Sequence, residues 1–222
     1  RMGLEADRAD DTIQIHSDAD RSDATWWRWI RTLEATVHVA LHVSSRIHLD
    51  LNAPAGDVHL SGLEGHFELD VMGGRCALEN LDGMLDLQAE SSTVSIDQFS
   101  GETLAAHVAA GTLSVRDVQS DTVALRSVDA PLTLDNVDGD LDVTANSTSV
   151  TLTNIGGPCT AENQGGPLTY KGPPDADTDL TVVGAPLNVH LPANHAADLA
   201  MVGPNLSLDA DFSFDGERTK NT

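Results

Sequence analysis

Apolar and polar residues alternate over short runs along most of the chain, a pattern typical of β-strands with one buried face. Val58 with Leu60 and Leu132 with Leu134 are examples. From Asp57 onward, similar runs return every 18 or 19 residues, for about eight units. A fixed period of this kind predicts a repeat protein, because one unit alone cannot bury its apolar stripe and must stack on its neighbours.

Each unit has the same internal order. A first strand ends at a residue that tolerates a left-handed backbone and therefore a sharp corner. These corner residues are Gly62, Asn80, Gln98, Asp117, Asn136, Asn154 and Gly172. An apolar residue follows each of the first six, and two positions after it a glycine recurs, with Ser120 as the exception. A second alternating strand and a small or polar turn complete the unit.

This order predicts an all-β fold: a single-stranded, right-handed β-helix, or β-solenoid, of about eight coils with 18–19 residues each. An antiparallel sandwich or meander is the alternative, but hairpin folds do not usually keep so regular a register. Residues 1–55 are expected to form an N-terminal β cap, 56–210 the solenoid and 211–222 a polar tail. In the cap, 12–16 and 36–51 read as strands, and 23–33, which contains Trp26, Trp27 and Trp29, as a short helix or an irregular loop. The prolines at 173, 174 and 192 predict looser coils near the C-terminal end.

Two cysteines, Cys76 and Cys159, do not form a disulfide framework. The repeat places them four coils apart, on the order of 19 Å at about 4.8 Å per coil. A disulfide requires Cα atoms within about 7 Å. Both thiols are therefore predicted to be free and buried.

Charge narrows the possible partners. The 222 residues carry 12 basic and 35 acidic side chains, a formal net charge of -23. Such a surface repels phosphate, which argues against nucleic acid as a partner, and no apolar run is long enough for insertion into a membrane. The excess of aspartate over lysine is also typical of salt-adapted proteins, with an acidic extracellular protein as the alternative. No signal peptide is seen, but Arg1-Met2-Gly3 does not read as a natural start, so a signal or anchor is expected to be missing from this sequence.

One outward position is a candidate ligand-binding strip. The third residue of successive units is a small hydroxyl residue in five consecutive coils: Ser95, Ser114, Thr133, Thr151 and Thr169. Stacked coils would align these hydroxyls on one flat face, where ordered water, a glycan or another copy of the same sheet can bind. The alternative is that Ser and Thr are simply favourable residues for an exposed strand.

Catalytic and metal sites are less well supported. Glu68 and Asp86 are expected one coil apart on an outward face, as polysaccharide-processing β-helix enzymes require of paired carboxylates, but alanines follow at the next two equivalent positions. Residues 135–140 resemble the start of a calcium loop, yet position twelve is Asn146 rather than glutamate. His38 and His42 lie about 13 Å apart on one strand, too far for one zinc ion. No catalytic residue, metal site or cofactor is therefore predicted.

The recurring segments Gly56 to Gly65, Asn80 to Gly83 and Asn136 to Leu141 resemble those of bacterial adhesin-like families, which are β-strand-repeat domains of unknown function. The tryptophans at 26–29 and the strand ending in Leu191-Pro192 are similar to elements of the same families. The resemblance covers roughly residues 36–210, although the prolines of the seventh and eighth units depart from the pattern. It implies a β-helix-like domain on an exported protein and supplies no catalytic residues.

Together these features lead us to expect a non-catalytic, extracytoplasmic binding or structural module at the cell surface, in the periplasm or secreted. Its partner is expected to be a glycan or another envelope component. Two alternatives remain open: a self-assembling β-helical scaffold that associates through exposed coil ends, and a carbohydrate-active enzyme.

Overall fold

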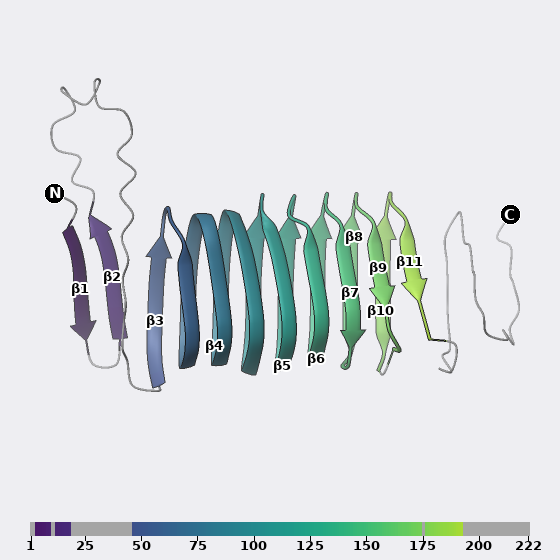
Figure 1. Ribbon diagram of the computed structural model, residues 1–222. Coiled ribbons are helices and arrows are strands. Elements are labelled where there is room, and N and C mark those ends of the chain that lie inside the picture. Colours follow the sequence, from purple (N-terminus) through teal and green to yellow (C-terminus); the bar gives the residue numbers. More distant parts are fainter. Residues whose placement is uncertain (1–2, 10–11, 19–45, 175, 193–222) are drawn as a thin grey trace, which may run out of the picture.

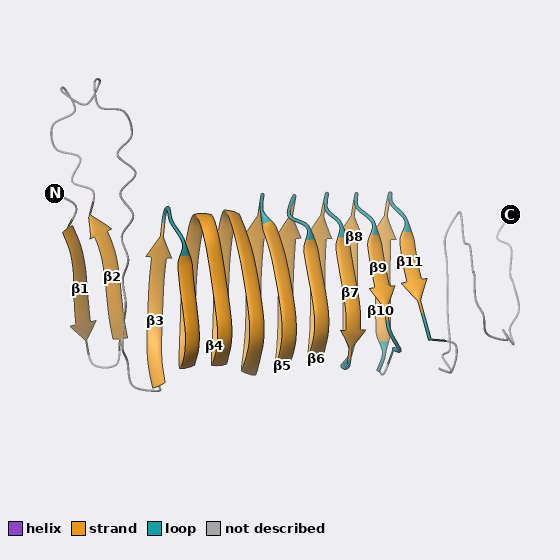
Figure 2. Ribbon diagram, in the orientation of Figure 1, coloured by secondary structure: helices purple, strands orange, loops and turns teal. Residues whose placement is uncertain are grey.

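The computed structural model describes residues 3–9, 12–18, 46–174 and 176–192. These residues form an all-β solenoid of about eight turns, and none of them lies in a helix (Figures 1 and 2). The predicted β-solenoid is thus confirmed, and the sandwich and meander alternatives are wrong for the repeat.

Three of the described strands, β4 to β6, run around corners of the solenoid without a break. The described strands are β1 (Gly3–Ala9), β2 (Thr12–Asp18), β3 (Arg46–Ala53), β4 (Val58–Ala109), β5 (Thr112–Val128), β6 (Leu132–Asn146), β7 (Val150–Ile155), β8 (Cys159–Gln164), β9 (Leu168–Lys171), β10 (Thr178–Val183) and β11 (Leu187–His190). β4 alone has 52 residues because the backbone stays extended through several successive corners.

Parallel pairing between coils builds two sheets. The first half of each coil forms the front sheet, which ends in β7, β9 and β11, and the second half forms the back sheet, which contains β3, β8 and β10 (Figure 1). Each residue lies beside the residue one repeat away. Thr133 pairs with Ser114, 19 residues before it, and with Thr151, 18 residues after it. The register predicted from the sequence is therefore the register of the sheet.

The core lies between the two sheets and is almost entirely aliphatic. Alternate residues of both half-coils point into it, as in the fully buried Leu78, Leu85, Leu104 and Leu134. Burial of each such side chain contributes about 1.5–3 kcal/mol, which makes the stacked stripe the main driving force for folding. Phe67, Phe99 and Tyr170 are enclosed in the same core.

All seven corner residues predicted from the sequence adopt a positive φ, from 52° at Asn80 and Asp117 to 124° at Gly172. The residues that follow, from Leu63 to Ile155, turn inward as expected, and all but Leu63 are fully buried. Side-chain amides also link neighbouring coils at this corner. Asn136 Nδ2 donates to Asp117 Oδ1 at 2.5 Å, and Asn154 Nδ2 donates to Asp135 Oδ1 at 3.3 Å.

The recurrent glycines form a column in which successive backbones approach closely. A Cβ added to Gly83 would lie 2.0 Å from the carbonyl oxygen of Gly65, and one added to Gly101 would lie 2.1 Å from that of Gly83. Ser120 fills the same column where the pairing of β5 with β6 shifts register between Gln119 and Thr122. The 19-residue coils thus place their additional residue at this corner.

The seventh coil is less regular, as predicted. Its chain leaves the sheet after Lys171, and no strand resumes until Thr178. Leu180 and Val182 of β10 are only half-buried, whereas Ala161 and Asn163, beside them in β8, are fully buried. Prolines 173 and 174 account for this break because neither can donate a backbone hydrogen bond to the next coil.

At the N-terminal end, β2 contains the strand predicted at 12–16, and β3 covers the second half of the strand predicted over 36–51. β1, which the sequence pattern did not indicate, pairs antiparallel with β2. β3 pairs in parallel with β4 in the coil register and extends the back sheet. The predicted Trp-rich segment at 23–33 and the predicted tail at 211–222 lie outside the described residues.

Both cysteines are free and buried, as predicted. Cys76 faces the core from the first half of its coil and Cys159 from the second half of a later one. Burial raises the pKa of each thiol to about 12. The folded state therefore holds these protons more tightly than the unfolded state does, so the stability that they contribute is present below pH 9 and is lost as pH rises toward 12.

Substitution of Gly83 by alanine is expected to lower the free energy of unfolding by at least about 3 kcal/mol, because the new Cβ meets a carbonyl oxygen of the preceding coil. Gly73→Ala is the matched control: Gly73 also has a positive φ, but its Cβ position is open, so the cost should be about 1 kcal/mol. Urea unfolding of both variants measures the difference. Equal losses would show that the close approach of the coils is not what requires glycine.

Neither thiol should react with a disulfide reagent at pH 8 in the native protein, because both are protonated and enclosed. In urea, both should react. The number of thiols titrated with and without denaturant checks this, and rapid labelling of the native protein would contradict the core position of the cysteines.

Candidate functional site

The five hydroxyl residues predicted as a binding strip form one continuous column on the front sheet. Ser95 pairs with Ser114, Ser114 with Thr133, Thr133 with Thr151, and Thr151 with Thr169. Successive members are about 4.8 Å apart along the solenoid axis. The structure therefore brings together all the predicted site residues, which span 75 positions of sequence, in a single row, here called the hydroxyl strip.

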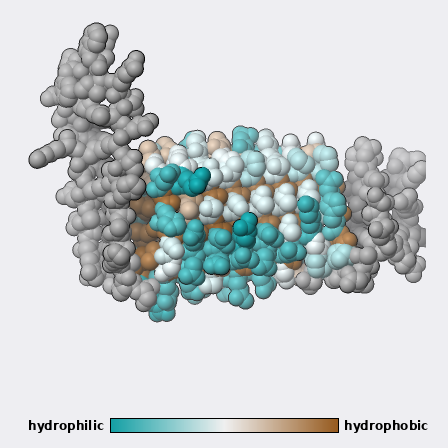
Figure 3. Space-filling view, in the orientation of Figure 1, coloured by the Kyte–Doolittle hydropathy of each residue, from teal (hydrophilic) through white to brown (hydrophobic). Residues whose placement is uncertain are grey.

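The hydroxyl strip lies between two other columns of the front sheet. On one side, Thr93 and Thr112 pair with each other and Ser149 occupies a later place in the same column. On the other side is a charged column, which runs through Glu79, Asp97, Arg116, Asp135, Thr153, Lys171 and His190. Figure 3 shows this face, where pale, weakly polar residues lie beside hydrophilic ones.

The front sheet offers a ligand hydrogen bonds and charges rather than aromatic stacking. Thr133 is exposed, and the other four strip residues are half-buried because neighbouring rows crowd them. All aromatic rings of Phe, Tyr and Trp in the described residues, those of Phe67, Phe99 and Tyr170, are enclosed in the core. Hydroxyl groups can donate and accept, so this row is chemically suited to other hydroxyl-bearing molecules.

The back sheet carries the carboxylates that were considered for catalysis. Asp50 pairs with Glu68, and the 18-residue register puts Asp86 next in the same outward column. Ala105 and Ala124 follow, and Asp142 comes after them. Glu68 and Asp86 are thus neighbours as expected, in a row of like charges that repel one another across the coils.

The arginine and histidine contacts with carboxylates that are found among the described residues all lie where β3 joins β4. Arg46 Nε contacts Glu64 Oε1 at 2.5 Å, and this contact raises the pKa of the guanidinium. His48 Nε2 lies 3.7 Å and His66 Nε2 lies 3.3 Å from Glu68 Oε1, and the two imidazole rings are 4.7 Å apart. The sequence analysis missed this cluster, although the 18-residue spacing of the two histidines could have revealed it.

An open hollow of about 460 Å³ runs along the glycine corner beside these contacts. Gly65, Gly83 and Gly101 form its base because they lack side chains, and its rim carries Arg46, Glu64, His66, Asp82, Met84 and Glu102. The hollow is thus a consequence of the close coil packing, and its rim holds charges of both signs.

No group of three His, Cys, Asp or Glu side chains within the described ranges is arranged to hold a metal ion. In the segment that resembled a calcium loop, Asp135 accepts a hydrogen bond from Asn154, which links it to the next coil. His38 and His42 lie outside the described ranges. Within those ranges, no helix has the length and apolarity needed to cross a membrane.

The last described coil exposes apolar side chains, Val183, Leu187 and Val189. The residues after Pro192 are not described, so association through coil ends stays a prediction.

Comparison with known proteins gives no match to any protein-family model, curated protein or solved structure. The structure supports the expected architecture, a β-solenoid of about eight turns. The adhesin-like resemblance beyond that architecture stays a prediction.

Asp86→Asn is expected to raise the urea midpoint at low salt, because it removes a like charge stacked on Glu68. The effect should correspond to about 0.5 kcal/mol and should shrink in 1 M NaCl, where the repulsion is screened. Asp142→Asn is the matched control, since Asp142 has Ala124 and Thr160 as column neighbours. Equal, salt-independent effects of the two variants would contradict column repulsion.

Proposed function

We propose that this protein is a non-catalytic, exported bacterial module of the cell surface or envelope, which binds a glycan or another envelope component through the hydroxyl strip. The observation that carries the proposal is the unbroken alignment of five Ser and Thr side chains over five successive coils. Export is supported by the acidic composition and by the resemblance of the repeat to adhesin-like domains.

A row of this kind suits a linear partner. Its hydroxyls recur at about 4.8 Å over a length of four coil spacings, on the order of 19 Å, on the outward face of a sheet. An extended polysaccharide placed along the solenoid axis could therefore meet several equivalent hydrogen-bonding groups in succession. Each contact is weak on its own, about 0.5–1.5 kcal/mol, so affinity would depend on their number.

The proposal is tested by replacing Thr133 and Thr151 together with methionine, which adds bulk and removes the hydroxyl without adding charge. Binding to insoluble peptidoglycan, dextran and alginate is measured by pull-down or calorimetry. For any of these polymers that the native protein binds, the double variant should bind at least about fivefold more weakly, because two adjacent contacts of the row are lost and the row is obstructed.

Thr144→Met is the matched control, because Thr144 is an exposed threonine of the back sheet, where it pairs with Arg126. Both proteins should keep the native urea midpoint within experimental error. If no polymer binds the native protein, or if the double variant binds as the control does, the front sheet is not a glycan-binding surface.

A further inference from the structure

Two histidines of neighbouring coils lie side by side on the back sheet. His48 of β3 pairs with His66 of β4 in the coil register, and the centroids of their imidazole rings are 4.7 Å apart. The two side chains are 41% and 39% exposed, so both rings are accessible from solvent. The pair therefore presents two imidazoles to any ion that reaches this face.

The same nitrogen of each ring is directed toward one point. His48 Nε2 lies 3.7 Å and His66 Nε2 lies 3.3 Å from a single oxygen atom, Oε1 of Glu68. A metal ion lies about 2.0–2.1 Å from each histidine nitrogen that binds it, so two ligand atoms of one ion are about 3–4 Å apart. Because both nitrogens already lie within this range of one common atom, only small rotations of the rings are needed for them to share an ion.

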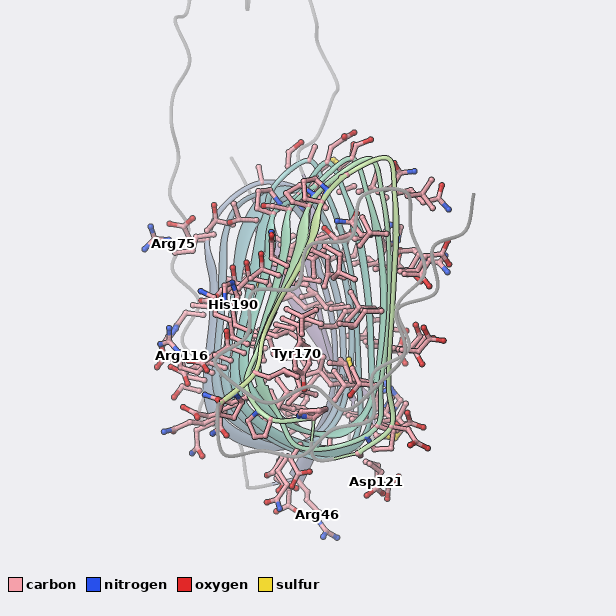
Figure 4. All side chains as sticks on the ribbon, turned by 90° about the vertical axis from the view of Figure 1, so that its right-hand side faces the viewer. Arg46, Arg75, Arg116, Asp121, Tyr170 and His190 are labelled. Carbon is pink, nitrogen blue, oxygen red and sulfur yellow. The ribbon has the colours of Figure 1, made fainter. Side chains whose placement is uncertain are left out.

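The charges around the pair favour a cation. Asp50, Glu68 and Asp86 form the adjoining outward column, and all three are exposed. Arg46 projects outward at the edge of its coil, away from the core (Figure 4), and its charge is offset by its ion pair with Glu64. The carboxylates of the adjoining column therefore attract a positive ion toward the two imidazoles.

The ligand atoms of the pair select the kind of ion. Imidazole nitrogen binds Cu²⁺, Ni²⁺ and Zn²⁺, whereas Mg²⁺ and Ca²⁺ require oxygen ligands, and Cu²⁺ binds such sites most tightly. No third His, Cys, Asp or Glu side chain among the described residues completes a set of metal ligands. Water would therefore supply the remaining ligands of an ion held here, and Glu68 would act through its charge.

We propose that His48 and His66 bind a divalent transition-metal ion, Cu²⁺ most tightly, through their Nε2 atoms. The ion joins β3 to the coil of β4 on which it packs. This bridge requires the folded arrangement of the two coils, so ion binding stabilises the folded protein. The inference goes beyond the proposed function, because the hydroxyl strip lies on the other sheet and the two sites can be tested separately.

The test is titration of the native protein with CuCl₂ in excess MgCl₂, followed by electron paramagnetic resonance. The spectrum of the bound Cu²⁺ should show hyperfine coupling to two nitrogen ligands, and saturating Cu²⁺ should raise the urea midpoint. His48→Gln and His66→Gln should each weaken Cu²⁺ binding at least about tenfold, because a single remaining imidazole loses the advantage of two linked ligands. ZnCl₂ should bind at the same site more weakly than CuCl₂.

His107→Gln is the matched control, because His107 is an exposed histidine of the back sheet that pairs with Arg126 rather than with another histidine. This variant should bind Cu²⁺ as the native protein does, and all three variants should keep a cooperative urea transition without metal. If His48→Gln or His66→Gln binds like His107→Gln, or if the spectrum shows one nitrogen ligand, the pair is not the site. Displacement of Cu²⁺ by the excess Mg²⁺ would also overturn the proposal, since it would indicate attraction to the acidic surface alone.

Discussion

The structure depends on hydrogen bonding between equivalent backbone positions of successive coils. Because each coil pairs in parallel with the next, all coils must adopt nearly the same backbone path, and a departure at one position disturbs two interfaces. This constraint accounts for the recurrence of positive φ angles at Asn80, Asn136 and Asn154. It also accounts for the glycine column, in which the carbonyl oxygen of one coil occupies the space that a Cβ of the next would need.

The same constraint turns sequence spacing into surface chemistry. A side chain on an outward position stands beside its equivalents 18 or 19 residues away, so repeated residue types become rows. Hydroxyl side chains within one row do not repel one another, whereas carboxylates within one row, such as Asp50, Glu68 and Asp86, do. The ion pair of Arg46 with Glu64 and the contacts of His48 and His66 with Glu68 lie at this end of the acidic row, where β3 joins the sheet.

Features that recur in every coil could be predicted from the sequence, whereas features that occur in a single coil could not. The first corner was predictable because Gly, Asn and Asp are the residues that enter the left-handed region at low cost. The closing turn of each coil uses the same conformation at Ser91, Ala110 and Asp129, of which Ser91 and Ala110 carry little such preference, so its geometry could not be read from residue type. The hydroxyl strip was predictable because every member has the same register position in five units.

Asn163 shows why single deviations are harder to predict. It occupies a column whose neighbours are Ala145 and Val182, and it is completely buried. Its Nδ2 donates to the carbonyl oxygens of Thr148 and Gly166, both at 2.9 Å, so the amide replaces an apolar contact with bonds that hold the closing turn. Nothing in the local sequence distinguishes this asparagine from an exposed one, because its partners lie in the turn of its own coil and in the coil before.

The shape of the solenoid also determines how this protein can recognise a ligand. Each sheet face is built from side chains at regular intervals, and the hollow at the glycine corner is open rather than enclosing. On such a surface, ligand specificity depends on which rows of side chains lie side by side. On the front sheet a hydroxyl row lies beside a row of mixed charge, whereas the outward row of the back sheet holds stacked carboxylates and alanines. The two faces therefore differ in chemistry: the front sheet presents hydroxyls beside charges of both signs, and the back sheet presents stacked carboxylates.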